Sequence, residues 1–93
     1  MTHELLTRVL DGIPSLRKDG AAYLVPDDLE LAIFIALPSE VLSVPRLARL
    51  EPTAELLIAE THKGERFFFA TKDVAGVKIG APEKRSTGGA GFR

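Results

Sequence analysis

The chain of 93 residues contains no cysteine and only two histidines, His3 and His62. The absence of cysteine excludes a disulfide framework, a zinc site built on thiolates, and a thiol nucleophile or redox pair. A chain of this length forms one domain with a modest core. Because no covalent crosslink holds that core, we expect it to be stabilised by packing alone or with help from a second subunit.

Long apolar runs are also missing. The longest, Leu31–Leu37, is far shorter than the ~20 residues that a membrane-spanning helix needs. The first residues, MTHELLTRVLDG, have neither the basic start nor the apolar stretch of a secretory signal. We therefore expect a cytoplasmic protein with no membrane span.

The sequence lacks a large excess of either charge, since its formal net charge is −1. Residues 1–81 hold nine basic and twelve acidic side chains, whereas residues 82–93 hold three basic and one acidic. A protein that neutralises many phosphates usually carries a basic excess. The acidic body therefore disfavours nucleic acid as a partner, although the basic tail keeps that alternative open.

The first segment predicts a helix. Thr2 is a suitable N-cap, and Asp11-Gly12 supplies a stop signal. The apolar side chains between them recur at helical spacing, at Leu5, Leu6, Val9 and Leu10.

Short strands are predicted after a polar connector at residues 15–20. Ala21–Val25 is a brief apolar stretch that ends at Pro26. Leu29–Leu37 alternates large aliphatic residues on one face and is largely apolar on the other, which is typical of a central strand or of one covered by the helix.

Residues 41–50 allow two interpretations. Pro45 cannot donate to a sheet ladder, so a strand here must lie at an edge or contain a bulge, and a bulge would also explain why Arg46 breaks the alternation. Alternatively, a short helix begins at Pro45 and ends before Pro52. We favour the bulged strand.

Residues 54–71 predict a hairpin with arms at Glu55–Thr61 and Glu65–Thr71, joined through His62-Lys63-Gly64. The competing interpretation is a helix from a Thr53 cap to Gly64, since Ala, Glu and Leu favour helices. The run Phe67–Phe69 favours strands, because it needs a nearby strand partner.

The assembled prediction is an α+β, mainly β domain. An N-terminal helix precedes a small antiparallel sheet or partly open barrel of about five or six short strands, the last within Asp73–Ile79. We assign residues 1–81 to a single globular domain and residues 82–93 to a flexible, Gly-rich basic tail.

No residue pattern predicts catalysis. His3 lies near a fraying terminus and His62 on a turn, neither of which suits a rigid site that excludes water. Asp27-Asp28 is best explained by turn geometry.

No residue pattern predicts a metal or phosphate site either. Glu60, His62 and Glu65 resemble a zinc site only weakly, and the glycines of residues 88–91 open no helix that would hold a phosphate. We expect no enzyme activity, no cofactor and no metal.

Binding to another macromolecule is the remaining expectation. By alternation Phe67 and Phe69 face the core, which leaves Phe68 under the helix, under the tail or in an interface. We predict a protein-binding or self-associating module, that is, an adaptor or a homo-oligomer. The alternative is a small nucleic-acid-binding barrel that uses Arg46, Arg49, Arg66 and Phe68 together with the basic tail. The candidate contacts are aromatic or basic: Arg46, Arg49, Phe68, and, in a tail that resembles a docking peptide, Lys84, Arg85, Phe92 and Arg93.

Overall fold

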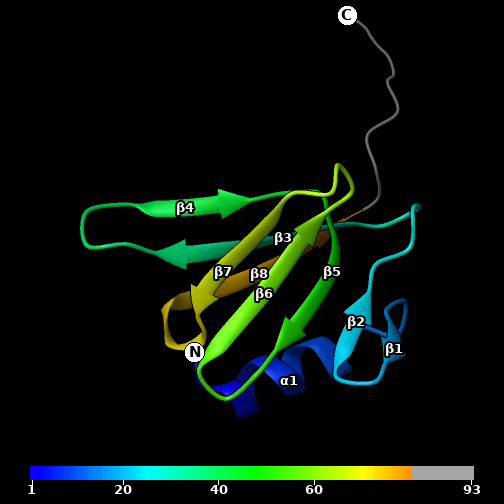
Figure 1. Ribbon diagram of the computed structural model, residues 1–93, viewed down its shortest axis with the longest axis horizontal. Coiled ribbons are helices and arrows are strands. Elements are labelled where there is room, and N and C mark those ends of the chain that lie inside the picture. The colour runs from blue at the N-terminus through cyan, green and yellow to red at the C-terminus, as the bar shows by residue number, and fades with distance from the viewer. Residues whose placement is uncertain (81–93) are drawn as a thin grey trace, which may run out of the picture.

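The computed structural model describes residues 1–80 and confirms the α+β, mainly β architecture (Figure 1). One helix, α1 (His3–Asp11), precedes eight strands in these residues. They are β1 (Arg17–Asp19), β2 (Ala22–Leu24), β3 (Glu30–Ala36), β4 (Val41–Val44), β5 (Leu47–Pro52), β6 (Leu56–Thr61), β7 (Arg66–Ala70) and β8 (Val74–Gly80), with a 3-10 turn at Thr71–Asp73.

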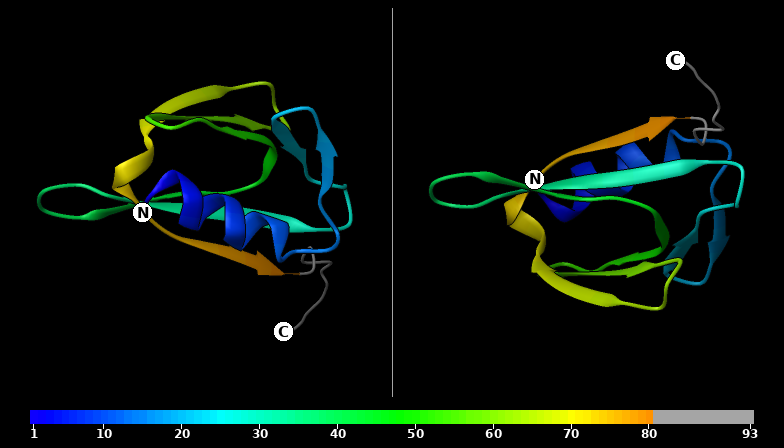
Figure 2. Two further views of the ribbon diagram at one scale, coloured as in Figure 1. Left: turned by 90° about the horizontal axis from the view of Figure 1, so that it is seen from below. Right: turned by 90° about the horizontal axis from the view of Figure 1, so that it is seen from above.

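The strands form two antiparallel sheets. One has five strands in the order β1-β2-β5-β6-β7, and the other has three in the order β4-β3-β8. Figure 2 shows the two sheets curving around a shared interior. No strand of one sheet pairs with a strand of the other within residues 1–80, so the barrel is open.

Residues 15–20 are not only a connector, because they contain β1. Its three residues are all charged and all exposed. They pair with β2 across a turn at Gly20, whose φ is +63°. The sequence gives no apolar signal for this strand, since Arg17, Lys18 and Asp19 bury nothing.

The single bulged strand predicted for residues 41–50 is wrong. The chain breaks at Pro45-Arg46, so that β4 pairs with β3 in one sheet while β5 lies between β2 and β6 in the other. Arg46 makes the break possible by adopting a left-handed φ of +58°. The register does shift, but within β5, between Leu47 and Arg49.

The hairpin predicted for residues 54–71 is confirmed, and the helical alternative is wrong. Gly64 takes the left-handed position at the turn, with φ +88°. Leu57 and Ala59 are fully buried, whereas Leu56 and Ile58 point outward. This two-residue alternation against the core outweighs the helical preference of the same residues.

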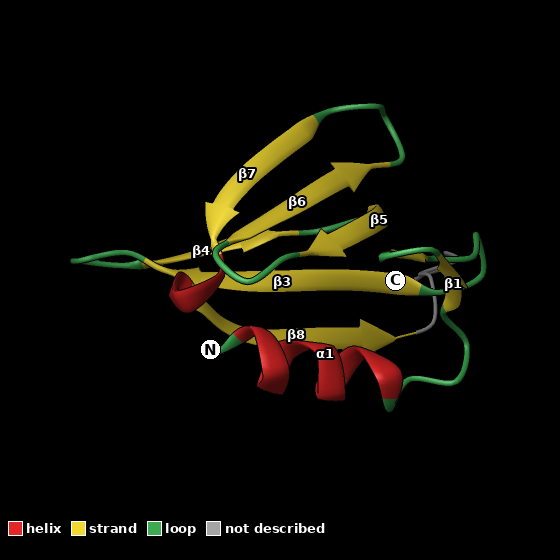
Figure 3. Cartoon of the chain, turned by 60° about the horizontal axis from the view of Figure 1, so that its bottom comes forward, coloured by secondary structure: helices red, strands yellow, loops and turns green. Residues whose placement is uncertain are grey.

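The inner faces of the two sheets and one side of α1 form the core. Leu31, Ile33 and Ile35 of β3 are at most 1% exposed, which confirms that β3 is central. Leu6 and Leu10 of α1 add to the same cluster, and the helix contacts β5. In the view of Figure 3 it lies below β3 and β8. As predicted, Thr2 caps the helix by accepting from the Leu5 amide at 3.1 Å.

A side-chain hydrogen bond fixes α1 to the five-stranded sheet. The hydroxyl of Tyr23, on β2, donates to Asp11 Oδ1 at 2.6 Å. Lys18 lies 3.6 Å from the same carboxylate and 5.1 Å from the centre of the Tyr23 ring. Burial and the bond to Asp11 raise the pKa of Tyr23 to about 12, and the same bond lowers the pKa of Asp11.

We predict that Tyr23→Phe removes part of the pH dependence of stability. The pKa of Tyr23 is raised above its unfolded value of about 10. The protonated hydroxyl therefore contributes to the free energy of unfolding of the wild type below pH 10, and this contribution is lost as the pH rises toward 12. The loss should be on the order of 1–2 kcal/mol. Urea unfolding between pH 8 and pH 12 measures it, and parallel curves for the two proteins would contradict the assignment.

Candidate binding surface

Among residues 1–80 the two sheets have four edges, and three of these carry features that discourage pairing with another chain. β1 is short and charged, and β4 is also short, with four residues that end before Pro45. β8 has a register shift where it passes Phe34 and Ile35, and it carries Lys78. β7 has neither proline nor bulge in its pairing with β6, and its one charge is Arg66.

The backbone groups of β7 alternate between its neighbour and its free edge. The Thr61 amide donates to the Glu65 carbonyl at 2.8 Å, and the Thr71 amide donates to the Glu55 carbonyl at 2.9 Å. In an antiparallel pair these bonds recur at every second residue. The amides and carbonyls of Arg66, Phe68 and Ala70 therefore point away from β6.

The outward face of this edge is apolar. Phe68 is 57% exposed, so α1 does not cover it. It lies opposite Ile58, and the adjacent outward pair is Leu56 with Ala70. Phe67 and Phe69 pack against the core with their rings stacked, as the alternation predicts. We call Leu56, Ile58, Phe68 and Ala70 the β7 patch.

The other side of the same edge opens into a groove of about 640 Å³. It lies between β4 and the β6–β7 hairpin, which extend in different directions in Figure 3. Its apolar wall consists of Leu42, Val44 and Phe67. Charged side chains of both signs lie along the rest of it, at Glu30, Arg46, Lys63 and Glu65.

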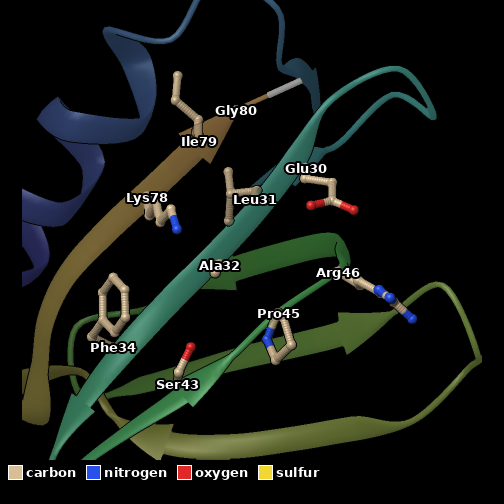
Figure 4. Close-up of a pocket in the computed structure, with 10 residues that line it drawn as sticks. All are labelled: Glu30, Leu31, Ala32, Phe34, Ser43, Pro45, Arg46, Lys78, Ile79 and Gly80. Carbon is tan, nitrogen blue, oxygen red and sulfur yellow. The ribbon is translucent and has the colours of Figure 1, made fainter. Parts of the chain in front are cut away.

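Arg46, a predicted contact, lies at the corner between the sheets rather than beside Phe68. Its carbonyl accepts from the His62 amide at 3.2 Å, and its side chain is exposed. It contributes to the groove and to a second one of about 490 Å³ near β3 and β8, where Figure 4 shows it beside Pro45 with Glu30 across from it.

We predict that the left-handed backbone of Arg46 lowers the stability of the fold. Such a conformation costs a non-glycine residue roughly 1–2 kcal/mol, which glycine avoids at some cost in unfolded-state entropy. Arg46→Gly should therefore equal the wild type or exceed it by up to ~1 kcal/mol. Arg46→Val should be less stable than either by about 1 kcal/mol or more. Urea unfolding compares the three, and equal losses for Gly and Val would show that the side chain matters more.

Arg49 lies on the same outward face as Phe68, but β6 separates their strands. Its guanidinium is 3.2 Å from Glu51, and it lies opposite Glu60, which in turn faces Arg66. The arginines of this face are therefore accompanied by carboxylates. The structure brings Arg49, Arg66 and Phe68 to one face and leaves Arg46 outside it.

The histidines are not held as catalytic groups usually are. His62 Nδ1 is 3.9 Å from Asp27 Oδ1, and the Asp27 side chain is fully exposed. His3 is the first residue of α1. Nowhere in residues 1–80 do three His, Asp or Glu side chains gather as metal ligands would, and this includes Glu60, His62 and Glu65.

The predicted tail contacts lie outside the described residues: Lys84, Arg85, Phe92 and Arg93. Within the described part of the chain, α1 is too short and too polar to cross a membrane. Sequence reasoning did not predict the groove, because β4 and the β6–β7 hairpin line it from opposite sides although β5 separates them in the sequence.

The chain matches no known protein-family model, no curated protein and no solved structure.

Proposed function

We propose that this chain is a non-enzymatic protein-interaction module that binds another polypeptide as an added strand along β7. The observation that carries the proposal is the unprotected edge, where the backbone groups of Arg66, Phe68 and Ala70 point outward beside an exposed aromatic ring. Strand addition uses such backbone groups for affinity and alternate side chains for specificity.

The two sides of the edge suit the two faces of an extended segment. Side chains on one face of the added strand would contact the β7 patch. Side chains on the other face would lie toward the groove wall of Leu42, Val44 and Phe67. Since successive side chains of a strand point to opposite faces, a segment with apolar residues at consecutive positions fits this edge best.

The nucleic-acid alternative has weaker support. Phosphate binding needs arginines whose charge is available, whereas Arg49 is paired with Glu51 and Arg66 lies opposite Glu60. Nucleic-acid binding therefore stays the alternative hypothesis, and binding through the predicted tail stays a separate prediction.

We predict that Phe68→Lys weakens binding at least tenfold while Leu5→Lys leaves it unchanged. Leu5 is the matched control, since it is 45% exposed and belongs to α1, outside both β7 and the β7 patch. The assay is selection of peptides from a displayed library of fragments of the organism's own proteins. Selected peptides should bind Phe68→Lys at least tenfold more weakly, because a charge at an interface centre costs more than 1.4 kcal/mol.

A second readout separates strand addition from side-chain docking. Methylating the peptide's backbone nitrogens one at a time should weaken binding at every second residue, because only alternate amides of an added strand bond to β7. Binding that does not depend on Phe68, or that tolerates every methylation, would contradict the proposal.

A further inference from the structure

We propose that the polypeptide that binds β7 is a second copy of this chain, paired antiparallel about a two-fold axis at Phe68. The inference rests on the function proposed above and specifies its partner. In this arrangement the two five-stranded sheets join, at their β7 edges, into one continuous sheet. A two-fold interface needs a surface that complements itself, and β7 meets this requirement in both backbone and side chains.

The backbone permits the pairing. Phe68 of one copy would exchange two hydrogen bonds with Phe68 of the other, since both of its backbone groups point away from β6. Arg66 would do the same with Ala70 of the second copy, because these residues have the same outward orientation. Every free amide and carbonyl of β7 thereby obtains a partner, which no other two-fold register achieves over the whole strand.

The side chains match in the same register. The sequence of β7 is Arg-Phe-Phe-Phe-Ala, so Phe67 meets Phe69 of the second copy while Phe68 meets its own counterpart. Three adjacent aromatic pairs would form across the junction. Aromatic cross-strand pairs are among the contacts that stabilise antiparallel sheets, and Phe68 would lose much of its present 57% exposure.

The charges are compatible with this register. Arg66 lies opposite the small Ala70, and the two Arg66 residues are four positions apart, roughly 13 Å along the strand. That separation exceeds the screening length of ~8 Å at physiological salt. At each end, Glu65 of one copy lies opposite Thr71 of the other, an uncharged residue just past the end of β7, so this register brings no like charge to Glu65. A register centred on Arg66 would instead place two like charges directly opposite each other.

The first test is the oligomeric state by size-exclusion chromatography with light scattering at high micromolar concentration. We expect the wild type to be a dimer. Phe68→Lys should be a folded monomer, because it places two ammonium groups on the axis. Val41→Lys is the matched control: Val41 is 61% exposed on β4, so this variant should stay dimeric. Circular dichroism checks that each variant folds.

The second test addresses the register. Ala70 lies opposite Arg66 of the second copy, so Ala70→Glu should tighten the dimer and Ala70→Lys should weaken it. The two variants change the same site by a similar volume, and a purely structural effect would affect them alike. With two such pairs per dimer, their dissociation constants should differ by roughly tenfold, and the difference should shrink in high salt.

Three results would overturn the inference: a monomeric wild type, a dimer that Val41→Lys disrupts while Phe68→Lys does not, or equal dissociation constants for the two Ala70 variants. A monomer that still binds library peptides through Phe68 would remove the second copy as partner and leave the proposed function standing. A monomer without Phe68-dependent binding would remove both.

Discussion

The change of sheet at Pro45-Arg46 determines the rest of this structure. A chain that continued straight from β4 into β5 would make one sheet, whereas the left-handed Arg46 sends β5 into the other sheet. The two sheets then bury their inner faces against each other without hydrogen bonds between their strands. The consequence is a small barrel with unpaired edges, because closure alone removes edges from a sheet. The open edge at β7 thus follows from how the core is enclosed.

The sequence predicted the elements whose signals are local. The capped apolar stripe identified α1, and the alternation of residues 29–37 identified β3. Alternation also predicted that Phe67 and Phe69 face inward and Phe68 outward. It failed at β1, where charged residues form a strand with no buried side, and at Arg46, since no propensity predicts a positive φ for arginine. The two failed predictions have one cause, because the extended backbone of β1 and the left-handed backbone of Arg46 are both imposed by residues elsewhere in the chain.

The candidate site was only partly accessible to sequence reasoning. Phe68 stood out because its ring has no place in the core, but whether β7 is an edge or a central strand depends on sheet order. That order is set by distant pairings, such as β2 with β5 and β3 with β8, for which the sequence holds no local signal. For the same reason Arg46 and Arg49, close in sequence, separate to different surfaces.

The pairing of β3 with β8 has a consequence for the order of folding. It is the most extensive strand contact between residues far apart in the sequence, joining Glu30–Ile35 to Val74–Gly80. Hairpins such as β6–β7 need only neighbouring residues and can form early. During synthesis, however, β3 must wait for some forty further residues before its second neighbour leaves the ribosome. Until then the apolar side chains of β3 are exposed to other nascent chains. We therefore expect this protein to aggregate more readily during synthesis on a polysome than during refolding in dilute buffer.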